Sequence, residues 1–305
     1  MNDAPLPVGV HRGVPATRYH AQAYASNSRL QRLKRSPAHL AAYLAESSES
    51  TTALRIGRAA HTSILEPDHF DVEFVAASAC TGVKKDGDPC AFAGSVLTDQ
   101  GWRCGTHVKG TNPVLEPRVV MKPDDLAACR GMRAAVRAHP LAGNLLRFAA
   151  DIELTLVWDD PETGIRCKAR PDLYAPTVLG GTFGDLKTTD DARAESFSRS
   201  ALAYGYFSQA AHYLDGAAVL GIAVEKFAFF AVEKSAPHGV VVYEPDADAL
   251  LMVRAENHAL LRTWATCAAL NEWPSYPATA RVLAMPAWAC SRAPYESITA
   301  EEATV

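Results

Sequence analysis

The chain has 305 residues, of which 48% are hydrophobic and 21% charged, and its formal net charge is −4. This composition excludes wholesale disorder, and no apolar run approaches the roughly 18 residues that a membrane helix needs. The acidic balance argues against a surface coated in positive charge for gripping nucleic acid. The first ten residues lack a secretory-signal pattern, and seven cysteines, an odd number, favour free thiols or a metal site over disulfides. We therefore expect a cytoplasmic protein.

The charge is unevenly distributed along the chain. Residues 1–70 contain eight Lys/Arg and five acidic residues, so the remaining 235 residues carry a net charge of −7. The densest basic run, RLQRLKR at 29–35, is either a solvated helix face or a helix that contacts phosphates beside an active site. The residues leave both interpretations open.

Apolar periodicity and helix-stop residues predict the order of elements along the chain. Helical periodicity dominates up to residue 150, strand alternation follows, and long helices return after residue 190. This mixture predicts a layered α/β or α+β domain. We expect an irregular segment over 1–25; helices over 26–47 (divided by Pro37), 51–67 (ended by Pro67), 123–140, 141–150, 191–221 (one helix or two) and 245–273; and strands over 71–77, 151–160, 165–175, 182–189, 225–234 and 239–245.

Two acidic residues and a lysine stand on neighbouring predicted strands. Asp172 ends one strand and Asp185 lies in the next, with twelve residues between them. Asp185 and Lys187 share one strand face because they are two residues apart. Leu186 points the other way, into the core. Converging carboxylates need a cation, oxygen ligands favour Mg²⁺ or Mn²⁺, and a nearby lysine can assist a water. The bare spacing also suits a turn carboxylate beside an exposed strand face.

The motifs around these residues resemble a known family. Pro171-Asp172 followed by Asp185-Leu186-Lys187 is similar to the PD-(D/E)xK nuclease pattern, and six further motifs in order resemble the exodeoxyribonuclease VIII (RecE-like) branch found in phages and prophages. The resemblance implies one domain over 1–305 with a restriction-endonuclease-like core, in which helices flank a central mixed β-sheet. The motifs are YHAQAYASNSRLQRLKRSPAHL, IGRAAHTSILEPDHF, ELTLVWDDPETGIRCKARPDLY, GDLKTTDDARAESF, YGYFSQAAHYLDG, and NEWPSYP with LAMPAWA.

The resemblance implies roles at the metal site. Asp172 and Asp185 would bind Mg²⁺ or Mn²⁺ with the backbone carbonyl of Leu186, and Lys187 would be the catalytic lysine. His61 would reach the metal site from its helix, and Glu153 would supply another acid near the metal. The alternatives are a structural histidine and a surface glutamate on an edge strand.

The resemblance also implies DNA contacts. Gln209 and Tyr213 lie at i and i+4 on one helix face and match a Q-x-x-x-Y motif that borders the DNA in this branch. Arg170, Thr188 and Thr189 would lie on the phosphate side. A packed amphipathic face is the alternative for Gln209 and Tyr213.

The implied reaction is metal-assisted hydrolysis of phosphodiester bonds. The resemblance alone implies digestion of linear double-stranded DNA from an end, 5′ to 3′, to leave a 3′ overhang for phage-type recombination. It further implies a bacterial or phage-encoded protein, a single-strand annealing protein as partner and a homo-oligomer. The alternatives are a flap or single-stranded DNA endonuclease of the same superfamily, or a non-catalytic DNA- or protein-binding module.

Residues 78–110 predict a small zinc-binding insert. Cys80, Cys90, Cys104 and His107 follow the spacing Cys-x9-Cys-x13-Cys-x2-His, and three thiolates with one imidazole make a closed tetrahedral zinc site. The segment resembles short zinc motifs of the form C…TKxGxPC…C-x-x-H, and a loop with free thiols is the alternative. Such an insert would fold mainly by binding metal, and it would either lie near the DNA entrance or bind a partner. The other cysteines, Cys129, Cys167, Cys267 and Cys290, are expected to be buried thiols.

Overall fold

The computed structural model describes residues 4–45, 52–114 and 118–285. A five-stranded sheet in the order β12-β11-β10-β9-β6 forms its centre. β10 and β11 are parallel and every other neighbouring pair is antiparallel, so the expected central mixed sheet is confirmed. The strands are β6 (Asp151–Ile152), β9 (Leu173–Ala175), β10 (Thr182–Thr189), β11 (Lys226–Glu233) and β12 (Val240–Tyr243).

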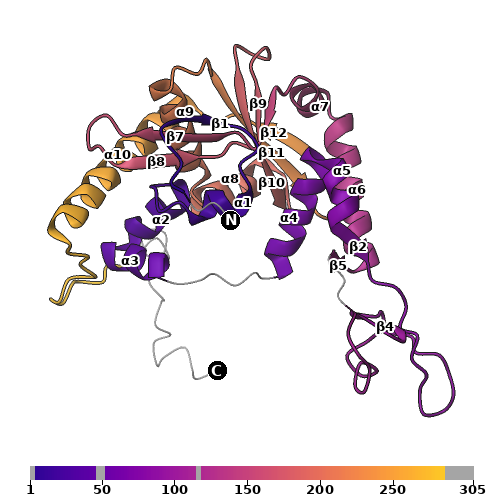
Figure 1. Ribbon diagram of the computed structural model, residues 1–305. Helices are drawn as coiled ribbons and strands as arrows, with labels where there is room; N and C mark the ends of the chain where they lie inside the picture. The colour runs from indigo at the N-terminus through magenta and orange to yellow at the C-terminus, as the bar shows by residue number, and fades with distance from the viewer. Residues whose placement is uncertain (1–3, 46–51, 115–117, 286–305) are drawn as a thin grey trace, which may run out of the picture.

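Helices pack on both faces of this sheet (Figure 1). β11 shows why, because Phe227 and Phe229 are buried in one core cluster while Phe230 and Val232 are buried in another, as alternation along a strand requires. The first cluster draws on α2 (Asn27–Arg35), α3 (Pro37–Ala45), α8 (Ala194–Ala203), α9 (Tyr206–Val219) and α10 (Ala247–Leu270). The second draws on α4 (Thr52–Leu65), α5 (Pro67–Glu73), α6 (Pro123–Ala138) and α7 (Pro140–Arg147). Within the described ranges, no helix is both long and apolar enough to cross a membrane.

A second, three-stranded antiparallel sheet has the order β1-β7-β8. It comprises β1 (Gly9–His11), β7 (Thr155–Asp159) and β8 (Arg166–Ala169). The single strands expected over 151–160 and 165–175 are therefore wrong, because each is divided between the two sheets. Glu153 breaks the first with a left-handed φ of 50°, and Pro171, which lacks an N–H donor, lies in the break of the second.

The irregular segment expected over 1–25 is also wrong in part. It contains β1 and α1 (Ala16–Ala21), and Leu6, Val14 and Tyr19 are buried against Val157 of β7. These elements are too short to show a period of their own, and their stability comes from contacts with residues more than 130 positions away.

The prolines and one glycine set helix boundaries. Pro37 divides α2 from α3 as predicted, and Gly205, with a φ of 69°, separates α8 from α9. Pro67 begins α5 instead of only ending the helix before it, since a proline at the first helical position loses no hydrogen bond. Helix α5 therefore occupies part of the strand expected over 71–77, which shrinks to β2 (Phe74–Ala76).

The insert leaves the body between β2 and β5 (Val119–Met121), which pair in parallel and so hold its two ends together. In Figure 1 it extends away from the sheet, beyond the lower ends of α4 and α6. It contains one antiparallel pair, β3 (Val96–Thr98) with β4 (Gly101–Arg103). The buried cluster of the insert consists of Cys80, Cys90 and Cys104. These cysteines therefore occupy the position that large apolar side chains fill in an ordinary core.

Candidate active site and cysteine–histidine cluster

The end of the β9–β10 pairing brings Asp172 to Asp185. The antiparallel ladder stops at Gly184 opposite Leu173, so β10 has an open edge beyond Gly184. Asp172 precedes β9, and its Oδ2 accepts a hydrogen bond of 2.6 Å from the N–H of Leu186 on that edge. The Leu186 side chain is buried in the opposite core cluster, as predicted.

Lys187 and Asp185 form a buried ion pair on the face of β10 that points toward α9. Gln209 of α9 bonds both of them, because its amide nitrogen donates to Asp185 Oδ1 and its oxygen accepts from Lys187 Nζ at 3.0 Å. The Lys187 ammonium also lies 4.5 Å from the ring centroid of Tyr206. The lysine is therefore held by three neighbours on two elements.

His61 and Glu153 complete the cluster from α4 and from the break after β6. His61 Nε2 lies 2.8 Å from Asp172 Oδ2, and His61 Nδ1 lies 3.7 Å from Glu153 Oε1. Glu153 also pairs with Arg170, whose guanidinium donates to the carbonyl of Val14 at 2.9 Å. The left-handed turn at Glu153 thus directs its carboxylate into the site and not onto a surface.

Burial and mutual repulsion perturb the titrating groups. Burial and the neighbouring carboxylate of Asp172 raise the pKa of Asp185 to about 6. Burial alone would lower the pKa of His61, but Asp172 and Glu153 raise it to about 9. The pKa of Asp172 is lowered against the effect of burial because His61 and Lys187 favour its carboxylate. Shifts of this kind are concentrated at functional sites.

The carboxylates suit a divalent metal. Asp185 Oδ2 is buried and touches only the Lys187 ammonium, with no hydrogen bond of normal geometry. Unsatisfied buried oxygens are rare in proteins, and oxygen donors are the ligands that Mg²⁺ and Mn²⁺ prefer. The chemistry of the donors therefore suits the expected metal, with Asp172, Asp185 and Glu153 as the available carboxylates. Within the described residues, however, their ligand atoms are not gathered as closely as those of Cys80, Cys90, Cys104 and His107.

A cavity of about 850 Å³ opens over this cluster. His20, Arg58 and Tyr206 line it in addition to the predicted residues, and none of these three was expected from the sequence. All three lie inside the motifs of the resemblance, but those motifs assigned them no role, and the short helix carrying His20 gave no periodic signal. Other lining residues are Gly13, Val14, Pro15, Ala16, His61, Glu153, Arg170, Leu186, Lys187 and Thr188.

The residues expected to contact DNA lie in different surroundings. Thr188 lines the cavity, whereas Thr189 donates to the carbonyl of Asp191 at 3.0 Å. Gln209 contacts the Asp185–Lys187 pair, and Tyr213 is largely buried with its ring 6.0 Å from that of Phe227. DNA contact by these residues, and by Arg170, stays a prediction.

In the basic run at 29–35, Arg29 and Lys34 contact other groups of the protein. Arg29 is buried and donates to the carbonyls of Gln22 and Tyr24 at 2.5 and 2.6 Å. Lys34 pairs with Glu256 of α10 at 2.8 Å. Phosphate contact by this run stays a prediction.

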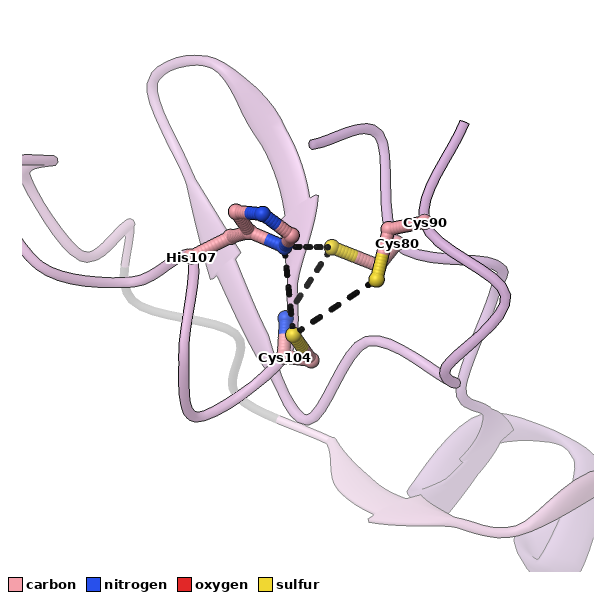
Figure 2. Close-up of side chains that lie close together, drawn as sticks. All are labelled: Cys80, Cys90, Cys104 and His107. Carbon is pink, nitrogen blue, oxygen red and sulfur yellow. Dashed lines mark hydrogen bonds between the residues drawn. The ribbon is translucent and has the colours of Figure 1, made fainter. Parts of the chain in front are cut away.

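Cys80, Cys90, Cys104 and His107 converge within the insert (Figure 2). The Sγ atoms of Cys90 and Cys104 are 3.9 Å apart, and His107 Nδ1 lies 3.5 and 3.4 Å from the sulfurs of Cys80 and Cys104. A tetrahedral zinc site requires about 3.8 Å between sulfurs and about 3.5 Å between sulfur and nitrogen. The four ligand atoms therefore lie at zinc-site spacing and too far apart for a disulfide.

The local backbone prepares this cluster for a cation. The N–H of His107, followed by that of Thr106, lowers the pKa of Cys104 to about 6, which favours the thiolate that metals bind. Gly82 lies so close to the His107 ring that an added Cβ would be 2.5 Å from it. Beyond the insert, Cys129, Cys167 and Cys267 are buried as expected, and Cys290 lies outside the described residues.

Comparisons with known proteins agree with this geometry. A family model described as "PDDEXK-like domain of unknown function (DUF3799)" matches residues 26–284. The chain is also similar to a crystal structure from Eubacterium rectale described as a "Putative exonuclease", with a TM-score of 0.52 and 14% identity over 90% of this chain and 96% of that one. A search of curated proteins gave no significant match.

Proposed function

Since the chain belongs to the family of PDDEXK-like domains, we propose that it is a metal-dependent exonuclease acting on double-stranded DNA. The sequence motifs predicted this membership at the level of the superfamily. The observation that carries the proposal is the clustering of Asp172, Asp185 and Lys187 beside one cavity, which is lined by Lys187 itself and by His61, the partner of Asp172. These are the residues that the superfamily pattern requires: Asp185 and Lys187 lie on β10, and Asp172 immediately precedes β9. A binding module would not need a buried pair of carboxylates beside a lysine.

A divalent metal held by Asp172 and Asp185 would offset charge on the scissile phosphate and activate the attacking water. Lys187 faces the same point as Asp185, and its ammonium stabilises charge that develops on the phosphate. Gln209 fixes these two side chains relative to each other. His61 and the Leu186 N–H together hold Asp172 in one orientation.

The Leu186 carbonyl is a supporting oxygen donor in this proposal. In an extended strand the N–H and C=O of one residue point toward the same edge, and the Leu186 N–H points toward Asp172. The carbonyl therefore lies on the open edge of β10, where the carboxylates gather. Glu153, which pairs with Arg170 and lines the cavity, would supply a further oxygen in this proposal.

Digestion from an end, 5′ to 3′, is supported by the order of the RecE-like motifs along the chain, as are recombination, an annealing partner and homo-oligomer formation.

Linear and covalently closed duplexes incubated with Mg²⁺ test the proposal, with Asp185→Ala as the inactive variant and Asp159→Ala, a change in an exposed ion pair, as its control. Loss of linear DNA alone supports an exonuclease, and duplexes labelled at either end report polarity. Cutting of closed circles indicates an endonuclease, and no metal-dependent loss of either DNA leaves a binding module.

We also propose that the module at 78–110 holds a structural Zn²⁺ through Cys80, Cys90, Cys104 and His107, as part of one nuclease domain over 1–305. The spacing of the ligand atoms and the lack of an apolar core support this. Metal analysis of the purified protein should find one zinc per chain, and Cys104→Ala should lose it. Zinc-free wild-type protein whose stability equals that of Cys104→Ala would contradict the proposal.

A further inference from the structure

The turn between α8 and α9 carries large apolar side chains beside the catalytic cluster. Leu202 is 76% exposed and Tyr204 is 68% exposed. Tyr206, two residues later, lines the cavity and lies over Lys187. Exposed aromatic and aliphatic groups that border a site are typical of a contact surface.

The backbone of this turn is tightly fixed. Gly205 adopts a left-handed conformation, and its carbonyl accepts a hydrogen bond of 3.3 Å from Asn27 Nδ2 of α2. An added Cβ at Gly205 would lie 2.6 Å from the Gln31 side chain, which itself bonds Ser208 at 3.0 Å. The two tyrosines are therefore presented by a turn that is held against α2.

The rings form a continuous line from the lysine to solvent. Tyr206 packs against Phe197 and Phe229, with centroids 5.9 and 5.8 Å away. Tyr204 stacks on Tyr206 at 5.9 Å with an interplanar angle of 28°. Because Tyr206 lies 4.5 Å from Lys187 Nζ, the Tyr204 ring is within about 10 Å of that nitrogen, or about three nucleotide steps of 3.4 Å.

We propose that Tyr204, backed by Tyr206 and flanked by Leu202, is the platform on which an unpaired base within about three nucleotides of the scissile phosphate stacks. The inference rests on the proposed nuclease function and adds that the DNA bound beside the catalytic cluster is single-stranded. Aromatic side chains accept any base because every base has a π-face. An exonuclease that removes successive nucleotides of any sequence requires such tolerance.

The test measures binding of single-stranded oligonucleotides to protein that carries Asp185→Ala, so that no DNA is degraded. Adding Tyr204→Ala should weaken binding between about fivefold and 150-fold, and Tyr204→Trp should retain it. Since stacking displaces no counterions, the slope of affinity against salt should not change. Phe148→Ala, which removes an aromatic ring 47% exposed at the end of α7, is the matched control and should have no effect.

Unchanged binding by Tyr204→Ala, or an equal loss with Phe148→Ala, overturns the platform. If wild-type protein nevertheless degrades linear DNA, the proposed function survives and only the platform fails. If the Asp185→Ala protein binds no DNA and the wild type degrades none, both fail. A change in the salt slope with Tyr204→Ala would show that the turn acts through charge and would also overturn the stacking role.

Discussion

Replacing Asp185 by asparagine should stabilise the metal-free protein while abolishing its activity. The Asp185 carboxyl is 3% exposed, and its pKa is raised from 3.8 to about 6 by burial and by Asp172. The folded state therefore holds this proton more tightly than the unfolded state does. As the pH rises from 3.8 to 6, ionisation of Asp185 lowers the free energy of unfolding, and the full decrease persists above pH 6. At about 1.4 kcal/mol per pKa unit, this cost is about 3 kcal/mol.

Asparagine removes the charge and retains Oδ1, the atom that accepts the Gln209 hydrogen bond. The attraction of Lys187 is already included in the pKa of Asp185. The Nδ2 group of the asparagine would, however, face the Lys187 ammonium in place of Oδ2, and this contact between two donors offsets part of the gain. In EDTA at pH 8, Asp185→Asn should raise the free energy of unfolding by up to about 3 kcal/mol, or roughly 5–10 °C in Tm. The gain should shrink toward zero at pH 4.

Urea and thermal unfolding at both pH values measure this difference, with and without Mg²⁺. Magnesium should stabilise the wild type more than the variant, since binding to the folded state alone adds stability. Asp191→Asn is the control, because Arg193 lowers the pKa of that exposed carboxyl to about 2 and its loss should give no gain. A variant that is less stable than wild type at pH 8 in EDTA, or a difference that is equal at both pH values, would refute the reasoning.

Three other perturbations have defined outcomes. Lys187→Met should reduce Mg²⁺-dependent DNA hydrolysis at least about 100-fold in a nuclease assay, whereas Lys234→Met at an exposed ion pair should not. Burial lowers the pKa of His212 to about 4, so between pH 4 and 6.5 the unfolded chain binds more protons than the folded chain, and the free energy of unfolding falls as the pH falls. His212→Gln should reduce this fall by up to about 1.4 kcal/mol per pH unit, as measured by urea unfolding. Cys104→Ser should expose residues 78–110 to limited proteolysis yet leave the thermal unfolding of the body nearly unchanged, because the cysteine cluster is separate from the two main cores.

The parts of the site that the sequence predicted are those that depend on short spacings. Asp185 and Lys187 share a face because strand geometry alternates, and that alternation also buries Leu186 in the opposite core. The spacing of Cys104 and His107 likewise allows one shared ion without knowledge of the rest of the fold. Such relations hold wherever the local element forms.

The parts that could not be predicted depend on contacts between distant segments. The N-terminal segment lines the cavity because buried Lys168 donates to the carbonyls of Tyr19 and Gln22 at 2.6 and 2.7 Å. A lysine in a strand gives no sign of such a partner. Likewise, the resemblance implied that Gln209 borders the DNA, but it did not predict the contact of Gln209 with both Asp185 and Lys187.

The charges of the site also explain how an acidic chain can suit DNA. Each carboxylate of the cluster has a cationic partner: Asp172 with His61, Asp185 with Lys187, and Glu153 with Arg170. With His61 protonated, as its pKa of about 9 implies near neutral pH, the six charges cancel. A divalent cation in this cluster therefore adds positive charge where a phosphodiester must lie. Affinity for DNA at the site should thus follow metal binding and not the net charge of −4 carried by the whole chain.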